Sequence, residues 1–179
     1  MKRKKRMILF VVLMAVLLIT GCGTGGENGD ASESGRNESG RTFGSFEAEL
    51  FGGGATGDKI FKEAQVTMVN VWATYCGYCI DEMPYFKDFA EKYKDRGFQV
   101  VGIVTDAASA EDEAVGRIIE ETGADYPQIV FNQSMFDTYL KDVQAVPATV
   151  FVDQNGNIIE EYLGAKSRED WENIIEGLL

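Results

Sequence analysis

The segment that decides the fold is VTMVNVWATYCGYC, residues 66–79. Its first eight residues form an apolar run rich in strand-forming side chains, and an amphipathic stretch begins at Ile80. The pattern therefore predicts a buried strand that leads into a helix, with Cys76 and Cys79 at the junction. A helix N-terminus presents unpaired N–H groups and the positive end of the peptide dipoles, which lowers the pKa of a thiol there. The sequence thus predicts a reactive pair of thiols.

The composition narrows the explanations for this pair, because the chain holds three cysteines and no histidine. A zinc site needs four ligands, and the third cysteine, Cys22, lies far away beside an apolar N-terminal segment. A purely structural disulfide is the alternative, although its ring would enclose few residues and would remove little entropy from the unfolded chain. We therefore expect no metal and no cofactor other than a redox-active disulfide.

The N-terminal residues are typical of an exported lipoprotein. A basic segment, residues 2–6, precedes an apolar stretch from Met7 to Ile19. This stretch suits a signal peptide and is short for a membrane span, which needs about 20 residues. The residues up to Gly21-Cys22 resemble the bacterial lipobox. We expect residues 1–21 to be a lipoprotein signal peptide and Cys22 to be the lipid attachment point; an incidental cysteine in an uncleaved anchor is the alternative.

Glycine and short polar residues dominate the segment that follows Cys22, up to residue 42. This composition predicts a flexible tether, so that residues 22–42 would hold the protein at the extracytoplasmic face of the bacterial cell membrane. Five of the 17 Lys and Arg residues precede Cys22, so the processed chain would keep 12 of them against 29 Asp and Glu, a formal charge of −17. An acidic surface repels phosphate backbones, which argues against nucleic acid as a partner, and membrane attachment would come from lipid.

The remaining residues, 43–179, suffice for a single domain with its own core. Strand patterns occur at residues 46–50, 66–73, 98–104, 128–131, 148–153 and 157–163, and helix patterns at 76–94, 109–123, 134–141 and from 167 onward. Ser109 and Ser167 each begin a capping-box pattern, and Asn155-Gly156 predicts a tight hairpin. This order predicts an α/β fold in which helices flank a central mixed β-sheet.

Residues 72–84, WATYCGYCIDEMP, resemble the active-site segment of proteins with the thioredoxin fold. More narrowly, they resemble the membrane-anchored ResA/TlpA-like thiol-disulfide oxidoreductases, whose pattern is W-x-x-x-C-x-x-C-x-x-E-x-P. Val146-Pro147, directly before a predicted strand, extends the resemblance, which covers essentially all of residues 43–179. It implies a thioredoxin-like fold with an N-terminal strand or hairpin and a TlpA-type helical insertion after the strand at residues 98–104.

The resemblance implies a role for each residue near the thiols. Cys76, first on the helix and the more exposed, is expected to be the nucleophile, Cys79 the resolving thiol, and the two to form a disulfide. Glu82 shares a helix face with Cys79 and is expected to tune its pKa and to relay its proton; an exposed helix glutamate is the alternative. Asn70, which cannot ionise, stands where thioredoxins carry a buried Asp. Glu82 is therefore the nearest candidate for an ionisable group that exchanges a proton with the thiols.

The resemblance also implies a substrate-binding region. The Val146–Pro147 bond is expected to be cis and to pack against the dithiol, with Val146 offering backbone hydrogen bonds to a substrate peptide; an edge-strand proline is the alternative. Trp72 and Tyr75 are expected to line the same region, although a core role for Trp72 is equally compatible with its position.

These features predict an extracytoplasmic thiol-disulfide oxidoreductase, with a thiol peroxidase on the same fold and a redox-inert lipoprotein binding module as alternatives. The peroxidase pattern P-x-x-x-T-x-x-C is absent around Cys76. The resembled family consists mostly of reductases that a DsbD/CcdA-like membrane protein supplies with electrons, with apocytochrome c or oxidised repair enzymes as protein substrates. The negative charge of Glu82 and of the domain also favours a reductase. The middle pair Gly77-Tyr78 differs from the family's usual residues and leaves the substrate open.

Overall fold

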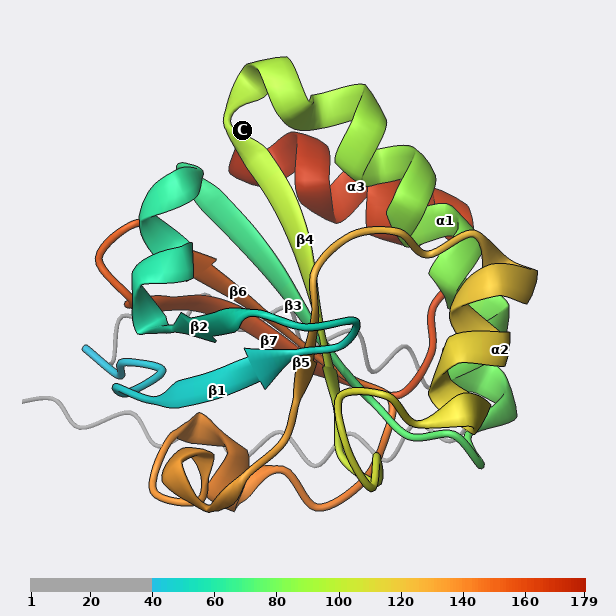
Figure 1. Ribbon diagram of the computed structural model, residues 1–179. Coiled ribbons are helices and arrows are strands. Elements are labelled where there is room, and N and C mark those ends of the chain that lie inside the picture. The colour runs from blue at the N-terminus through green and yellow to red at the C-terminus, as the bar shows by residue number, and fades with distance from the viewer. Residues whose placement is uncertain (1–39) are drawn as a thin grey trace, which may run out of the picture. The chain divides into compact units, whose positions relative to one another are not determined.

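The computed structural model describes residues 40–179. The predicted signal peptide (1–21), Cys22 and nearly all of the predicted tether (22–42) therefore lie outside the described residues. The described chain is built around a mixed seven-stranded sheet with the order β2-β1-β5-β4-β3-β6-β7 (Figure 1). Its elements are β1 (Glu47–Leu50), β2 (Ala55–Gly57), β3 (Val66–Trp72), α1 (Gly77–Tyr93), β4 (Phe98–Val104), α2 (Glu113–Thr122), β5 (Gln128–Val130), β6 (Ala148–Asp153), β7 (Ile158–Leu163) and α3 (Arg168–Leu178). The predicted α/β fold with a mixed sheet is confirmed.

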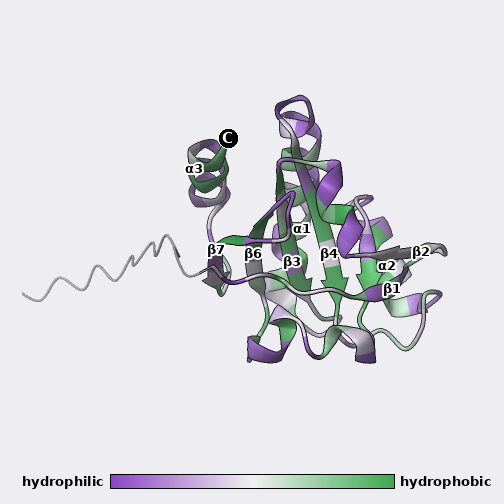
Figure 2. Ribbon diagram, turned by 90° about the vertical axis from the view of Figure 1, so that its left-hand side faces the viewer, coloured by the Kyte–Doolittle hydropathy of each residue, from purple (hydrophilic) through white to green (hydrophobic). Residues whose placement is uncertain are grey.

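Strands β3 and β4 form the centre of the sheet. They pair in parallel along their whole length, β5 pairs in parallel with β4, and β6 pairs antiparallel on the other side of β3. All seven residues of β3 are buried. Continuous apolar runs are typical of strands covered on both faces, and Figure 2 shows the hydrophobic colour along these central strands. Both runs, at 66–73 and 98–104, are therefore correctly predicted as buried strands.

Two apolar clusters, one on each face of the sheet, form the core. On one face, α1, α2 and α3 pack against even-numbered residues of β3, among them Met68 and Trp72. On the other face, Val69 and Val71 pack against the segment before β1 and against short 3₁₀ helices. Because side chains alternate along a strand, every even-numbered residue of β3 faces the three α-helices. Cys79 belongs to the cluster on that helical face.

Helix α2 begins three residues later than the sequence predicts. The predicted cap, Ser109, accepts a hydrogen bond from the N–H of Glu111 and closes a turn that precedes the helix. Asp112 is the N-cap, because its Oδ1 accepts hydrogen bonds from the N–H groups of Ala114 (2.9 Å) and Val115 (3.3 Å). Both residue types cap helices well, and the one whose oxygen reaches two free N–H groups sets the start.

The single short helix predicted at residues 134–141 is wrong. The structure instead has two 3₁₀ helices, Gln133–Met135 and Tyr139–Asp142. Thr138 separates them, because its hydroxyl donates to the carbonyl of Met135 (2.6 Å) and accepts from the N–H of Leu140 (3.3 Å). A threonine hydroxyl that competes for backbone groups in this way ends one turn and starts the next.

The hairpins and the last helix agree with the sequence pattern. Gly156, at φ 82°, completes the turn between β6 and β7, and β1 and β2 form an N-terminal antiparallel hairpin. Ser167 caps α3 through a hydrogen bond from the N–H of Asp170 (3.1 Å). Within residues 40–179, no helix has the length and apolar character to span a bilayer.

Candidate active site

The two cysteines of the motif are joined at the start of α1. Their sulfur atoms are 2.03 Å apart and form a disulfide. Cys76 is the N-cap residue of the helix, and its Sγ accepts a hydrogen bond from the N–H of Cys79 at 3.2 Å. Cys76 is 8% exposed and Cys79 is fully buried. Cys76 is thus the more exposed of the two residues, as the sequence predicts.

Glu82 lies one helical turn after Cys79 and is buried, so the alternative of an exposed helix glutamate is wrong. Its Oε1 accepts hydrogen bonds from the indole N–H of Trp171 (2.6 Å) and from the backbone N–H of Lys166 (2.8 Å). Burial raises the pKa of this carboxyl above its ordinary value, and the two hydrogen bonds oppose the rise only in part. Glu82 therefore holds a proton more readily than an exposed glutamate.

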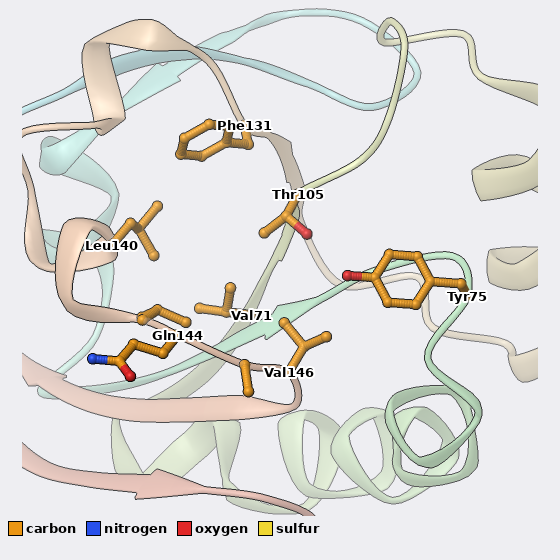
Figure 3. Close-up of a pocket in the computed structure, with 9 residues that line it drawn as sticks. Val71, Tyr75, Thr105, Phe131, Leu140, Gln144 and Val146 are labelled. Carbon is orange, nitrogen blue, oxygen red and sulfur yellow. The ribbon is translucent and has the colours of Figure 1, made fainter.

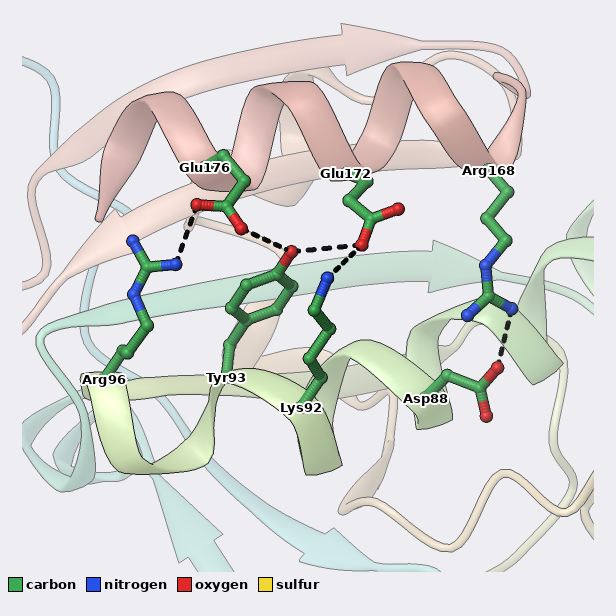
Figure 4. Close-up of polar contacts among 7 residues, drawn as sticks. All are labelled: Asp88, Lys92, Tyr93, Arg96, Arg168, Glu172 and Glu176. Carbon is green, nitrogen blue, oxygen red and sulfur yellow. Dashed lines mark hydrogen bonds and ion pairs between the residues drawn. The ribbon is translucent and has the colours of Figure 1, made fainter.

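Helix α3 and the segment before it supply both partners of Glu82, and polar contacts fasten this helix to α1 (Figure 4). Glu172 contacts Lys92, and Glu176 accepts hydrogen bonds from the hydroxyl of Tyr93 (2.9 Å) and from Arg96 (2.7 Å). Such exposed ion pairs each contribute little to stability, because solvent screens them. They nonetheless lie in a row along the contact between α1 and α3 and help to position α3. They thereby also help to position the two donors to Glu82.

The sheet beneath α1 carries an uncharged polar pair. Asn70 in β3 is fully buried and lies directly opposite Thr149 of β6. Among the described residues, neither the amide of Asn70 nor the hydroxyl of Thr149 has a hydrogen-bond partner, and the same is true of Oε2 of Glu82. All three residues belong to the helical face or to the inner side of α1. Since an amide and a hydroxyl do not ionise here, the carboxyl of this region is supplied by Glu82 and not by the strand.

Trp72 is fully buried, in the core cluster that also contains Cys76 and Cys79, which favours the core role that its position allowed. Its indole N–H donates to Oε1 of Gln128 in β5 at 2.9 Å. The Gln128 side chain reaches it by crossing Gly102 of β4, where an added Cβ would lie 1.9 Å from that oxygen. Sequence reasoning missed Gln128 and Gly102, although a glycine inside a buried strand often marks a close approach of this kind.

Tyr75, on the other side of Cys76 from the helix, is 78% exposed and stands at the rim of the site. The Val146–Pro147 peptide bond is cis, as the resemblance implies. Because Ala148 pairs with Val71 in the sheet, this bond lies at the strand edge from which residues 73–76 emerge. Tyr75 and Val146 are therefore brought to the same end of the sheet as the dithiol (Figure 3). Trp72, the last residue of β3, also lies at this end and packs in the same cluster as the two cysteines, but it is fully buried.

One further residue holds the loop before Cys76. Asp106, just after β4, accepts hydrogen bonds from the N–H of Thr74 at both oxygens (2.9 and 3.1 Å) and from the Thr74 hydroxyl (2.6 Å). The two residues meet because β3 and β4 are parallel neighbours that end side by side. Polar residues directly after adjacent parallel strands were the signal for this contact, and sequence reasoning missed it.

The described residues offer little to a metal ion. Within residues 40–179, no three His, Cys, Asp or Glu side chains come together closely enough to hold one. The groups at the site that can take part in chemistry are two sulfurs and one buried carboxyl.

A model of the Redoxin family matches residues 56–179. The thiol-disulfide oxidoreductase ResA of Bacillus cereus (strain ATCC 10987 / NRS 248) is 26% identical over 174 residues, which are 97% of each chain. ResA of Bacillus anthracis is 28% identical over 109 residues; that match spans 60% of each chain, less than two thirds of the relative's length.

Solved structures agree on the fold. The thioredoxin domain of a thiol-disulfide oxidoreductase from Bacteroides vulgatus aligns with a TM-score of 0.66 at 23% identity and covers 78% of this chain and 96% of its own. A thioredoxin family thiol:disulfide interchange protein from Chlorobium tepidum TLS aligns with a TM-score of 0.66 at 21% identity, over 78% of this chain and 97% of its own. The fold of the described chain is thioredoxin-like.

Proposed function

Because the chain belongs to the Redoxin family, we propose that it is a thiol-disulfide oxidoreductase whose redox-active dithiol is Cys76 and Cys79. The observation that carries the proposal is the disulfide at the start of α1, in which one sulfur is slightly exposed and the other is buried. Relatives named thiol-disulfide oxidoreductase support it. No cofactor is needed for this chemistry, since the disulfide itself carries the electrons.

The reaction runs through a mixed disulfide. In the reducing direction, the thiolate of Cys76 attacks one sulfur of a substrate disulfide, and the other substrate sulfur leaves as a thiolate that takes up a proton. The deprotonated sulfur of Cys79 then attacks Sγ of Cys76, which releases the second substrate thiol and restores the Cys76–Cys79 disulfide. The substrate gains two electrons and the protein dithiol loses them. Cys76 acts first because Cys79 is fully buried.

Glu82 is the group that handles the proton of Cys79 in this proposal. Cys79 must lose its proton before it attacks, and Glu82 lies one helical turn away on the same helix face. Burial raises the pKa of Glu82, which makes it a better proton acceptor than an exposed glutamate. Trp171 and Lys166 hold one carboxylate oxygen, and the other, Oε2, has no partner among the described residues.

We assign the protein the reducing direction. A carboxylate near Cys79 disfavours a second negative charge on its sulfur, so the reduced dithiol is less stabilised and gives up electrons more readily. The substrates would be disulfide-containing proteins, with apocytochrome c or an oxidised repair enzyme as candidates. A DsbD/CcdA-like membrane protein would resupply electrons. These assignments of substrate and donor rest on the resemblance of residues 72–84 to the ResA/TlpA-like proteins.

The proposed location is the extracytoplasmic face of the bacterial membrane, through lipid on Cys22. Its support is the sequence of residues 1–42, which lie almost entirely outside the described part of the chain. In cells that make the full chain, Cys22→Ser should move the protein out of the membrane fraction and abolish labelling by radioactive palmitate. Cys79→Ser is the matched control, because it removes a thiol without touching the lipobox. A Cys22→Ser chain that stays in the membrane would point to an uncleaved anchor.

The roles of the two thiols are tested by trapping. Cys79→Ala should accumulate a mixed disulfide with substrate proteins on Cys76, which mass spectrometry would identify after alkylation of free thiols. Cys76→Ala should trap far less, because Cys79 is buried. Trapping by Cys76→Ala alone would reverse the assignment of nucleophile and resolving thiol.

A titration with dithiothreitol separates the oxidoreductase from a redox-inert binding module. The wild-type disulfide should open in mild reductant and re-form with oxidised glutathione, as counted by thiol labelling. A disulfide that resists reduction until the protein unfolds would overturn the proposed function.

A further inference from the structure

Lys166 brings a positive charge close to the buried carboxyl of the site. Its backbone N–H donates to Oε1 of Glu82 at 2.8 Å. Its side-chain nitrogen lies 4.7 Å from the centroid of the Tyr162 ring and 5.9 Å from that of the Trp171 ring, close enough for a cation–π contact. The indole N–H of Trp171 donates to the same oxygen of Glu82 at 2.6 Å. One lysine therefore contacts Glu82 through its backbone and contacts the indole that binds Glu82 through its side chain.

The start of α3 explains how Lys166 comes to lie over Trp171. Ser167 is the N-cap, so Lys166 and Trp171 occupy positions N′ and N4, whose side chains pack together in the hydrophobic staple. The methylene stem of a lysine can make such a contact and leave its ammonium at the edge. Lys166 is half-buried, and Trp171 is fully buried. A purely structural staple is therefore the alternative to a role in the chemistry.

The charge of Lys166 is not neutralised by an ion pair. Along the contact between α1 and α3, other cations each pair with a carboxylate; these pairs are Lys92 with Glu172, Arg96 with Glu176, and Arg168 with Asp88 (Figure 4). Within residues 40–179, Lys166 forms no such pair. Its field therefore acts on Glu82, and it lowers the pKa of this carboxyl in opposition to burial.

Other ionisable side chains also face this region. Asp81 precedes Glu82 on α1, and its negative charge raises the pKa of that carboxyl. Tyr126, before β5, is buried, which raises its own pKa and keeps it uncharged. On β7, Glu160 contacts the hydroxyl of Tyr162. Among these groups, the lysine supplies the positive charge.

We propose that Lys166 is a positioning residue for the reaction: its ammonium, held over the indole that binds Glu82, keeps this carboxyl ionised when Cys79 needs a proton acceptor. The inference rests on the proposed function and extends it to a residue outside α1. A carboxyl must be charged to take up a proton, and burial by itself favours the neutral form. The cation also polarises the indole, which strengthens the hydrogen bond from its N–H to the carboxylate.

The proton and electrons balance within the step already described. The proton passes from Sγ of Cys79 to the carboxylate of Glu82. The thiolate of Cys79 then forms a bond to Sγ of Cys76, and the bond between Cys76 and the substrate sulfur breaks. Lys166 exchanges neither proton nor electron. It acts on the charge of Glu82 alone.

The test measures the step that Cys79 performs. The full chain, purified in detergent and freshly reduced, is mixed in a stopped-flow instrument with 2,2′-dithiodipyridine, an uncharged disulfide that releases a coloured thione at each displacement. The first release, by Cys76, speeds up with probe concentration. The second, in which Cys79 displaces the remaining pyridyl sulfur from Cys76, does not. Cys79→Ala lacks the second release and so identifies that phase, whose rate is then measured over a series of pH values.

Lys166→Met keeps an apolar stem over the two rings and removes the charge. The second phase should accelerate as Glu82 ionises, and in Lys166→Met this acceleration should occur at higher pH. Below the wild-type midpoint the phase should slow about two- to fivefold, as expected for the loss of one partly exposed cation. Lys166→Arg keeps the charge and should retain the wild-type pH profile.

Two further variants locate the effect. Lys62→Met removes an exposed lysine from the 3₁₀ helix Asp58–Glu63, which precedes β3, and should leave the pH profile unchanged. In a Glu82→Gln background, Lys166→Met should not change the rate, because the ammonium no longer has a carboxylate to act on. A staple without a chemical role predicts the opposite, namely the same effect in both backgrounds.

The outcomes separate this inference from the proposed function. A wild-type pH profile in Lys166→Met, or an equal loss of rate with and without Glu82, would overturn the role of Lys166 and leave the oxidoreductase standing. A wild-type protein that releases one thione only, and forms no disulfide between Cys76 and Cys79, would overturn the proposed function and this inference with it.

Discussion

The side-chain oxygen of Gln128 occupies the space beside Gly102 that any larger residue would need: a Cβ on Gly102 would lie 1.9 Å from it. The same oxygen accepts the indole N–H of Trp72. Glycine in the middle of β4 thus allows a β5 side chain to satisfy a buried donor of β3. The contact links β5 to the last residue of β3, directly before the loop that leads to Cys76.

Gly102→Ala should therefore destabilise the protein. The new methyl group would displace Gln128 and leave the Trp72 N–H buried without a partner, at a cost of about 1–3 kcal/mol. Urea unfolding measures the loss of unfolding free energy. Gly177→Ala is the matched control, because its added Cβ meets nothing within 4 Å and its site on α3 is exposed. Equal stability of the two variants would contradict the assigned role of Gly102.

Glu82→Gln should change how stability depends on pH. The raised pKa of Glu82 means that the folded protein binds this proton more tightly than the unfolded chain. The stabilisation that results is complete below the unfolded pKa, near 4.5, and is lost as pH rises through the folded pKa. Glutamine does not titrate, so the unfolding free energy of Glu82→Gln relative to wild type should increase from pH 4 to pH 8.

The control for this pH series is Glu120→Gln, which removes one exposed carboxylate on α2. Urea unfolding of the three proteins at each pH provides the comparison. A relative stability of Glu82→Gln that is constant with pH, or that falls as pH rises, would show that the folded pKa of Glu82 is not raised.

Trp171→Phe should raise the pKa of Glu82 further. The hydrogen bond from the indole of Trp171 stabilises the charged carboxylate and is one of the contacts that oppose the effect of burial. Nuclear magnetic resonance of ¹³C-labelled glutamate carboxyl groups would follow the titration directly. Trp72→Phe makes the same change of side chain at an indole that binds Gln128, and should leave the titration of Glu82 close to wild type.

Asp106→Ala should slow the reaction of Cys76. The carboxylate holds both the N–H and the hydroxyl of Thr74, and without it the loop before Cys76 samples more conformations. Each such hydrogen bond is worth about 1 kcal/mol, so we expect a rate constant with peptide disulfides that is lower by up to about tenfold. Asp106→Asn keeps one acceptor oxygen, so its rate constant should lie between those of the wild type and of Asp106→Ala. Unchanged rate constants in both variants would exclude a positioning role.

The sequence predicts the elements whose signal is local. The apolar runs of β3, β4 and β6 each predict a strand. Ser167 caps α3 as the capping-box pattern predicts. Where two local signals compete, the pattern does not decide. Ser109 and Asp112 are both good caps, and Thr138 interrupts a segment that otherwise has helical spacing. In each case a hydrogen bond between one side chain and the backbone two or three residues away made the choice.

The residues of the site also differ in whether a local sequence signal or a distant contact determines their role. The CxxC motif and the helix spacing place Cys76, Cys79 and Glu82 together, because all three lie on one continuous helix or at its start. The strand pattern identifies Trp72 as important but cannot distinguish a buried indole from one that lines a groove. That distinction depends on Gln128, a residue 56 positions away along the chain.

The two donors to Glu82 have a consequence for the order in which the site is completed. Lys166 and Trp171 follow Glu82 by 84 and 89 residues. As the chain leaves the ribosome, both cysteines and α1 are therefore made long before the groups that fix the carboxyl beside them. A nascent chain that lacks α3 would already carry the thiols, yet their neighbouring acid would not be held in place. Maturation of the site thus waits for the last helix of the domain.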